Sequence, residues 1–400
     1  MESLRVGRLL LLLLGATACS AASSTAAPAP PAAVAEVPPP DAEVDAGPPP
    51  APSFPAAPQV VSSGGPVVTA PRVVPVFFSG DELQAKIEEL LVTLAGSTYW
   101  SAVTAEYGVG ALTVGASIVT SDAPPATDDA LQAWLASQPG AGPSTVFAVY
   151  YPTTAALEIH GKKSCEEFDG YHHDARTSAG AAFAFAVVSR CVSGSGTLDA
   201  ITKATSHELV EAVTDPFYYT KPAYASADPD HAAWTLATVG EVGDMCELEP
   251  QDGVRLGSFL VQRSWSNAAA AAGHDPCVPA VAGPYFTAAP ILLHDVPIDL
   301  GTATTTKGIR VPVGESRTIE IALRSDGPTA AWRVDARDGA ALFGGPKELD
   351  LTLDRKTGAN GDVLHLTITA RRPGSHGGSL LVLTSTLGAT SHVTLGFVAN

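Results

Sequence analysis

Two hydrophobic periodicities divide this chain. Between residues 66 and 285, short apolar runs alternate with segments whose apolar residues recur at helical spacing. From about Pro290 onward, apolar and polar residues alternate, and Gly- and Pro-rich turns separate the runs. The first pattern predicts a layered α/β (α+β) domain over residues 66–285. The second predicts an all-β sandwich of immunoglobulin-like type over residues 290–400.

The apolar runs locate the expected elements. One helix is expected to start at Thr197 or Asp199 and to end at Asp215, because Pro216 disfavours helical geometry in the residue before it. Residues 217–239 show weak periodicity and are expected to be rich in loops. The other expected helices lie after Asp81, near 99–107 and at 128–136, and the expected strands lie at 72–78, 111–119, 144–151, 181–188, 318–324, 349–353, 363–369, 379–384 and 392–398.

The N-terminus has the pattern of an export signal. Two arginines precede the apolar run Leu9–Leu14, and small residues then lead to Cys19. This order resembles a bacterial lipoprotein processing site, with residues 1–19 as the signal peptide region and Cys19 as the lipidated residue. Ala16 departs from that pattern, which usually has Leu there. The alternative is an ordinary secretory signal cleaved after Ala18 or a little later.

A segment dominated by Ala and Pro follows the leader. Residues 20–65 cannot build a core, and their proline runs favour extended polyproline conformations. We expect a tether that holds the folded part away from a membrane, with the lipid anchor as the contact to that membrane. The apolar run of the leader is too short to span a bilayer. The expected location is the cell envelope of a bacterium, at the outer membrane.

The composition restricts the class of partner. The chain has 400 residues, is 46% hydrophobic and carries a formal net charge of −18. This content suffices for large cores. Phosphate binding needs patches of Lys and Arg, so an acidic chain without basic clusters argues against nucleic acid as a partner.

Four cysteines remain after Cys19. An even number in an exported chain predicts disulfides, and three pairings are possible. We favour Cys165 with Cys191 and Cys246 with Cys277, because each pair closes a local loop. The alternative, a cysteine metal site, lacks C-x-x-C spacing.

The segment Ser206–Pro216 carries the clearest chemical pattern. His207 and Glu211 are four positions apart and project from one face of a helix, with Glu208 a quarter turn away. A zinc hydrolase uses this arrangement to hold the metal and activate water. The second anchor here is Glu, whereas the best-attested motif, H-E-x-x-H, has His. The pattern predicts a Zn²⁺ site of the H-E-x-x-E type with Glu208 as the general base.

A further ligand must come from elsewhere in the chain. Glu241 and Asp244 lie on a Gly-flanked segment that ends at Cys246, and either can complete the metal site. Asp244 can instead orient His207. Tyr171 and His172 are candidates for a ligand or for stabilisation of a transition state.

Four motifs in this order resemble a known family. They are Gly170–His172, Ser206–Pro216, Gly240–Cys246 and Val261–Asn267, followed by Cys277. Together they are similar to the EXORDIUM, or phosphate-induced, family of plant cell-wall proteins and exported bacterial relatives. The resemblance covers roughly residues 70–280 and implies a zincin-like domain. It implies a metal site at His207 and Glu211, completed by Glu241 or Asp244.

Two functions follow from these patterns. The first is a zinc metallopeptidase, a hydrolase of peptide bonds. The second is a non-catalytic envelope protein that binds wall polymer or another surface protein. In that case Trp234 and Trp265 are expected to contact sugar if their rings are exposed. The alternative for the helix itself is that its His and Glu side chains only form hydrogen bonds. His365 and His376 lack partners at ligand spacing and are expected to be ordinary strand or surface residues.

Overall fold

The computed structural model describes residues 54–191 and 197–400. The expected leader, the lipidation site Cys19 and most of the expected tether lie outside the described residues. Residues 54–65, which we assigned to the tether, belong to the folded part. Strand β1 (Val60–Val61) pairs with β10 (Ser226–Ala227), and Val60 is 1% exposed. The ordered chain therefore begins before residue 66.

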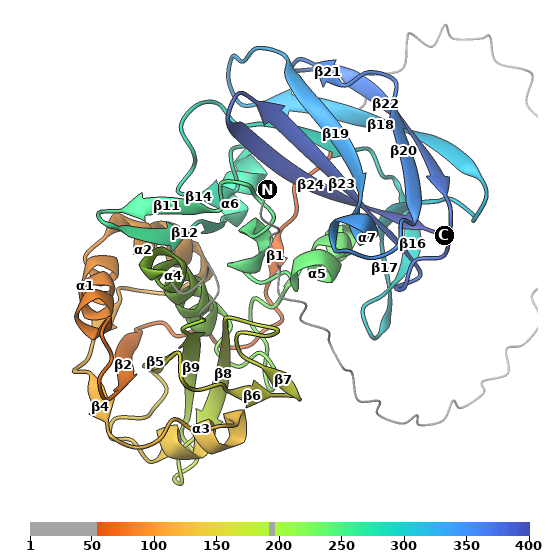
Figure 1. Ribbon diagram of the computed structural model, residues 1–400. Coiled ribbons are helices and arrows are strands. Elements are labelled where there is room, and N and C mark those ends of the chain that lie inside the picture. The colour runs from red at the N-terminus through yellow and green to blue at the C-terminus, as the bar shows by residue number, and fades with distance from the viewer. Residues whose placement is uncertain (1–53, 192–196) are drawn as a thin grey trace, which may run out of the picture. The chain divides into compact units, whose positions relative to one another are not determined.

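A mixed sheet forms the centre of the α/β part, with strand order β3-β2-β5-β9-β8 and β4 also paired to β2 (Figure 1). Only β8 runs antiparallel to its neighbour. Strand β5 reads TVFAVYY and is buried along its whole length, as expected for a strand covered on both faces. The strands are β2 (Arg72–Phe78), β3 (Thr113–Val114), β4 (Ile118–Thr120), β5 (Thr145–Tyr151), β8 (Gly170–Arg176) and β9 (Ala182–Ser189).

Helices cover both faces of this sheet because its side chains alternate between them. Phe147 of β5 packs with Leu131 and Leu135 on one face, whereas Tyr150 packs with Ile87 and Val213 on the other. Helix α3 (Asp128–Ala136) therefore covers the first face. The second face is covered by α1 (Gln84–Ala95), α2 (Thr98–Thr104) with the short 3₁₀ helix η1 (Ala105–Tyr107), and α4 (Leu198–Thr214).

Short elements connect the sheet to the sandwich. Residues 217–239, expected to be loops, contain β10, η3 (Pro229–His231) and α5 (Ala232–Thr238). The remaining short elements are β6 (Glu158–Ile159), β7 (Lys162–Lys163), η4 (Asp244–Cys246), β11 (Gly253–Leu256), β12 (Phe259–Gln262), β13 (Ser264–Trp265), α6 (Asn267–Ala272) and β14 (Cys277–Val278).

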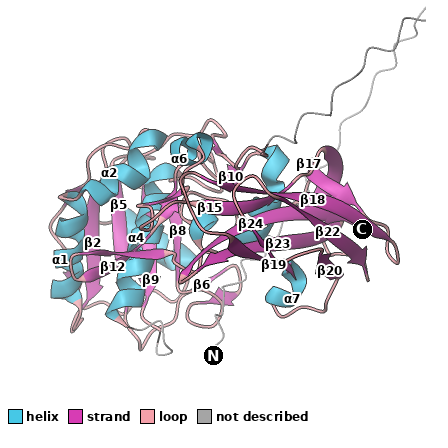
Figure 2. Cartoon of the chain, turned by 90° about the horizontal axis from the view of Figure 1, so that it is seen from above, coloured by secondary structure: helices cyan, strands magenta, loops and turns pink. Residues whose placement is uncertain are grey.

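The C-terminal part is a two-sheet β-sandwich, drawn almost entirely as strands in Figure 2. One sheet has the order β15-β18-β22-β20, and the other has β16-β17-β24-β23-β19-β21. Trp332, Leu366 and Leu381 belong to the core between them. The elements are β15 (Phe286–Pro290), β16 (His294–Asp299), β17 (Ala303–Arg310), β18 (Ser316–Ser325), β19 (Trp332–Asp338), α7 (Gly339–Leu342), β20 (Leu349–Leu353), β21 (Thr357–Gly358), β22 (Val363–Ala370), β23 (Gly378–Leu387) and β24 (Thr390–Ala399).

The coarse fold prediction is confirmed. The chain is mixed α/β, mostly β, with helices beside the first sheet and a sandwich after it. Both expected disulfides, Cys165–Cys191 and Cys246–Cys277, are present. Within the described residues, no helix is long and apolar enough to cross a membrane.

Candidate metal centre

Three segments bring acidic and histidine side chains together on the α4 side of the sheet. Helix α4 supplies His207, Glu208 and Glu211, and strand β8 supplies His172. The segment around η4 supplies three carboxylates, and Figure 1 shows α4 running beside β8 and β9. We call these seven side chains the acidic cluster: His172, His207, Glu208, Glu211, Glu241, Asp244 and Glu247.

Local structure explains why α4 presents its residues inward. The side chain of Thr197 accepts a hydrogen bond from the Ala200 backbone N–H and caps the N-terminus of the helix. Helical spacing then places His207 and Glu211 on one face, with Nε2 of His207 3.2 Å from Oε2 of Glu211. Every residue from Thr205 to Thr214 is buried. The sequence-predicted triplet His207, Glu208 and Glu211 therefore lies in the interior.

Strand alternation separates Tyr171 from His172. The hydroxyl of Tyr171 donates a 2.7 Å hydrogen bond to Oδ1 of Asp128, on helix α3. Nδ1 of His172 lies 3.5 Å from Oε2 of Glu211 instead. The role that we assigned to Tyr171, ligand or stabiliser of a transition state, is therefore corrected, because its hydroxyl is engaged on the other face of the sheet. His172 lies in the cluster.

The η4 segment closes the cluster. Oε1 of Glu241 lies 3.5 Å from Nε2 of His172, and Oδ1 of Asp244 lies 3.8 Å from Nε2 of His207. The backbone N–H of Asp244 also donates to Oε1 of Glu211 at 3.1 Å. Both sequence-predicted candidates for the further ligand thus lie within 4 Å of a histidine.

Two glycines allow this close approach. A Cβ on Gly243 would lie 2.7 Å from Oε1 of Glu211 and 2.8 Å from Nδ1 of His207. A Cβ on Gly170 would lie 2.5 Å from Oε1 of Glu208. Real Cβ atoms do not approach other atoms so closely, so a larger residue at either position would displace the side chains of the cluster.

Burial and mutual charge shift the pKa values of the cluster. Burial raises the pKa of Glu208 to about 8, and burial together with neighbouring carboxylates raises the pKa values of Glu241 and Asp244. Burial opposes ionisation of Glu211 as well, but His207 and His172 outweigh it and lower the pKa of Glu211 to about 2. Without a cation, the cluster therefore retains protons that free carboxyl groups would release at neutral pH.

The residues fit a divalent cation. Three groups place their possible ligand atoms within 4.8 Å of one another, and each contains one histidine and two carboxylates. Imidazole nitrogen and carboxylate oxygen are ligands of Zn²⁺. Nε2 of His172 and Oε1 of Glu241 are buried and make no hydrogen bond with the described residues. Buried polar atoms normally have a partner, and a cation would provide one.

Sequence reasoning missed two residues of this centre. Oε1 of Glu247 lies 4.0 Å from Nδ1 of His207. The side-chain amide nitrogen of Gln262 lies 2.8 Å from the same Nδ1 and 2.9 Å from the carbonyl oxygen of Gly243. Gln262 belongs to the motif Val261–Asn267, for which the sequence predicts no role. The sequence feature that could identify Glu247 as a member of the centre is its position three residues after Asp244.

The structure also tests candidates outside the cluster. A fourth group, Cys165, Asp169 and Cys191, contains two cysteines that are joined in a disulfide and are not free thiolates. Trp234 and Trp265 are each 3% exposed and pack against each other with ring centroids 5.5 Å apart. The hypothesis that these two rings contact sugar is wrong.

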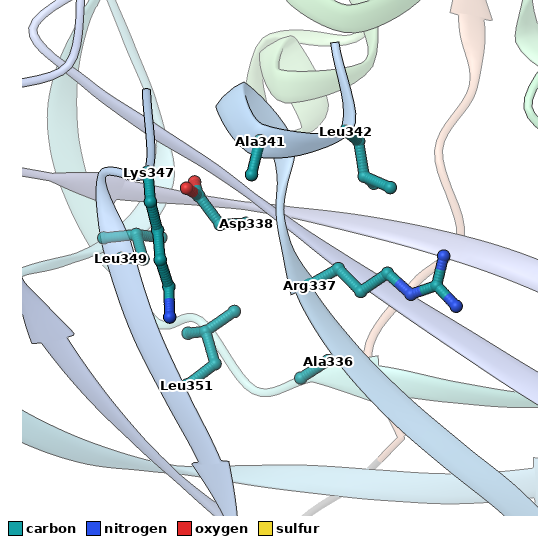
Figure 3. A pocket seen from close by; sticks show the side chains of 8 residues that line it. All are labelled: Ala336, Arg337, Asp338, Ala341, Leu342, Lys347, Leu349 and Leu351. Carbon is teal, nitrogen blue, oxygen red and sulfur yellow. The ribbon is translucent and has the colours of Figure 1, made fainter. Parts of the chain in front are cut away.

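A hollow of about 300 Å³ opens beside α7 in the sandwich (Figure 3). Lys347 lies on its rim and pairs with Asp350 at 2.7 Å. The lining of this hollow contains no histidine or cysteine, so the hollow does not repeat the chemistry of the cluster. The lining residues are Ala336, Arg337, Asp338, Ala341, Leu342, Lys347, Leu349 and Leu351.

Comparisons with known proteins give no name for this centre. No family model and no curated protein matches the chain. Among solved structures it is similar to the titin M3 domain, with 14% identity and a TM-score of 0.18, over 29% of this chain and 94% of that one. It is also similar to domains 1–6 of the surface layer protein SbsC, with 13% identity and a TM-score of 0.18, over 32% of this chain and 18% of that one. Similarity at this level carries no inference about function.

Proposed function

We propose that this chain is an exported, envelope-anchored zinc metallopeptidase with a zincin-like α/β domain related to the EXORDIUM family. One observation carries the proposal: three separate segments bring two imidazoles and five carboxylates into one cluster, and six of these seven residues are at most 8% exposed. Taking that many ionisable groups out of water is costly unless they are paired or bind a metal. The envelope anchor rests on the leader and Cys19.

His207, Glu211 and Asp244 are the proposed holders of the cation. Nε2 of His207 lies 3.2 Å from Glu211 and 3.8 Å from Asp244, so all three can turn toward one point. A bound Zn²⁺ would act as a Lewis acid and would lower the pKa of a coordinated water. Neutral imidazole and two carboxylates would compensate the charge of the cation in this buried site.

Glu208 is the proposed general base. The residue is 6% exposed, and its carboxylate lies 4.0 Å from Nδ1 of His172 and against the backbone of Gly170. Its pKa, raised to about 8 by burial, suits a group that exchanges protons near neutral pH. A fixed carboxylate beside the ligand residues can take a proton from water and return it to a leaving amine.

Strand β8 supports an extended peptide as the substrate. It is the last strand of the sheet order β3-β2-β5-β9-β8, and among the described residues it has a strand partner on one side. An extended chain can add to such an edge through main-chain hydrogen bonds. Because His172 lies on β8 itself, a peptide docked there would place a carbonyl group near the cluster.

The variant Glu208→Gln tests catalysis separately from binding. The wild-type chain loaded with Zn²⁺ should cleave members of a peptide library, and the variant should keep its metal while kcat falls about 10²–10⁴-fold. Metal content measured on the same samples is the control for the site. Equal cleavage by both proteins would reject Glu208 as the base. Metal binding without cleavage by either protein would favour the non-catalytic envelope function instead.

A further inference from the structure

The acidic cluster contains more ligands than one cation uses. The group His172, Glu211 and Glu241 and the group His207, Asp244 and Glu247 each have ligand atoms within 4.8 Å of one another, and they share no residue. We propose that the centre holds two divalent cations, the second one at His172 and Glu241 with Glu211 between the two positions. This inference rests on the proposed metal centre at His207 and adds a second site to it.

The geometry of His172 and Glu241 fits two ligands of one cation. Nε2 of His172 and Oε1 of Glu241 are 3.5 Å apart. An N–H···O hydrogen bond would bring them to about 2.7–3.2 Å. Two ligands held at about 2.1 Å in tetrahedral geometry lie about 3.4 Å apart. Both atoms are buried and have no hydrogen-bond partner in the described part of the chain.

The other side of the His172 ring faces two carboxylates. Nδ1 of His172 lies 3.5 Å from Oε2 of Glu211 and 4.0 Å from Oε2 of Glu208. Negative charge on this side of the ring favours the tautomer that carries its proton on Nδ1, which leaves Nε2 as a metal ligand. This arrangement directs Nε2 of His172 toward Glu241.

Glu211 lies between the two positions. Its Oε2 atom is 3.2 Å from Nε2 of His207 and 3.5 Å from Nδ1 of His172, and its Oε1 atom accepts the hydrogen bond from the Asp244 backbone. One carboxylate is therefore adjacent to both histidines. In proteins that bind two metal ions together, the ions are about 3.5–4 Å apart, a distance that one side chain can reach across.

The charge of the cluster also favours two cations. Each of its five carboxylates lies within 4.0 Å of His172 or His207, and within the described residues none forms an ion pair with Lys or Arg. Four of the five carboxyl groups are buried, whereas the side chain of Glu247 is 40% exposed. When these four are ionised and the imidazoles are neutral, one divalent cation would leave two carboxylate charges uncompensated, whereas two cations would leave none. Uncompensated charge in a buried site is costly.

Metal content per chain tests the second site. Full-length protein purified in detergent is equilibrated with Zn²⁺, dialysed and analysed for zinc and protein. We expect two zinc ions per wild-type chain and one in each of the variants His172→Gln and Glu241→Gln. His173→Ala is the matched control: its ring stacks on Tyr219 and it lies next to His172 on the same strand, so the variant should keep two.

The outcomes separate this inference from the proposed function. One zinc per wild-type chain, unchanged in His172→Gln and Glu241→Gln, would overturn the second site and leave the proposed metal centre intact. No bound zinc would overturn both. Two zinc ions per chain that persist in both variants would also overturn the proposed second site, because the second ion would then lie elsewhere. Circular dichroism confirms that each variant is folded before its zinc is counted.

Discussion

At the scale of single residues, the cluster depends on side chains that hold the ligands as well as on the ligands. Nδ1 of His207 and the carbonyl oxygen of Gly243 both lie within 2.9 Å of the Gln262 amide nitrogen. This contact holds the ring of His207 in place, with its Nε2 toward Glu211 and Asp244. Gln262 therefore positions His207 without touching the proposed cation site.

Removal of this contact should weaken metal binding. The variant Gln262→Leu keeps the volume of the side chain and loses its hydrogen bonds, so the affinity for Zn²⁺ should fall about 10–100-fold. Competition with a chromogenic chelator measures the change. The control is Gln132→Leu, on α3, where the amide binds Asp128 away from the cluster. Equal affinities in wild type and Gln262→Leu would show that Gln262 has no positioning role.

The residues of the centre differ in how far the sequence predicts them. Helical spacing alone places His207 beside Glu211, because i and i+4 share a face whatever the surroundings are. Glu247 and Gln262 reach His207 only through the path of the chain after α4, on segments without periodic pattern. No local rule gives that path. Tyr171 and His172 are an intermediate case. The sequence identifies the motif that contains them, but only the strand face to which each side chain points shows that His172, and not Tyr171, lies in the cluster.

At the scale of elements, the segment around η4 is held in place by a disulfide. Cys246 ends η4 and is bonded to Cys277, a separation of 31 residues, whereas Cys165 and Cys191 are 26 residues apart. Loops of similar length should stabilise the fold by similar amounts, about 3.5 kcal/mol each in the chain-entropy model. Cys246 is also two residues from Asp244 and next to Glu247.

Loss of either disulfide should lower Tm, but only one loss should affect the metal. In the double variant Cys246→Ser with Cys277→Ser, both Tm and zinc affinity should fall. The matched pair Cys165→Ser with Cys191→Ser should lower Tm by a similar amount and keep zinc affinity within about twofold. Differential scanning calorimetry and a zinc titration give the two quantities. Identical effects on zinc affinity would contradict the role given to Cys246.

Elements with a strong periodic pattern are predictable from the sequence, whereas elements with a weak pattern are not. Helix α3 has the expected bounds, Asp128–Ala136, because its apolar residues repeat cleanly. The strand expected at 111–119 is two short strands, since Gly115 between them lies against Arg72 and Val74. The helix α5 lies in a stretch expected to be loops. Burial of Trp234 against Trp265 stabilises it, and that contact between distant segments is invisible in its local sequence.

At the scale of the whole molecule, the metal-free cluster should make stability depend on pH. The folded chain holds protons that the unfolded chain releases, because the pKa of Glu208 in the cluster is raised from 4.5 to about 8 and that of Asp215, at the end of α4, from 3.8 to about 6. Burial is the main cause in both. The stabilising contribution of such a group is complete below its unfolded pKa and is lost as pH rises through its folded pKa. The raised pKa of His207 acts in the same direction.

Urea unfolding in the presence of a chelator should show this dependence of the metal-free stability on pH. The free energy of unfolding should fall by about 2–4 kcal/mol as pH rises from 4.5 to 8. Glu211 acts oppositely, because its pKa is lowered to about 2 and its contribution is lost only in stronger acid. With Zn²⁺ present the trend should reverse, since the cation competes with protons for the same ligands. A metal-free stability that is constant or rises across this window would contradict the account.

The central claim is that the acidic cluster is a metal centre. Equilibrium dialysis against micromolar Zn²⁺, followed by elemental analysis, tests it most directly. The wild-type chain should retain zinc, and the variants His207→Ala and Glu211→Gln should each lose it at the site near His207. The variant His365→Ala removes an exposed histidine that pairs with Asp354 in the sandwich, and it should bind zinc like the wild type. A wild-type chain that retains no zinc, or a Glu211→Gln variant that retains as much as the wild type, would contradict the claim.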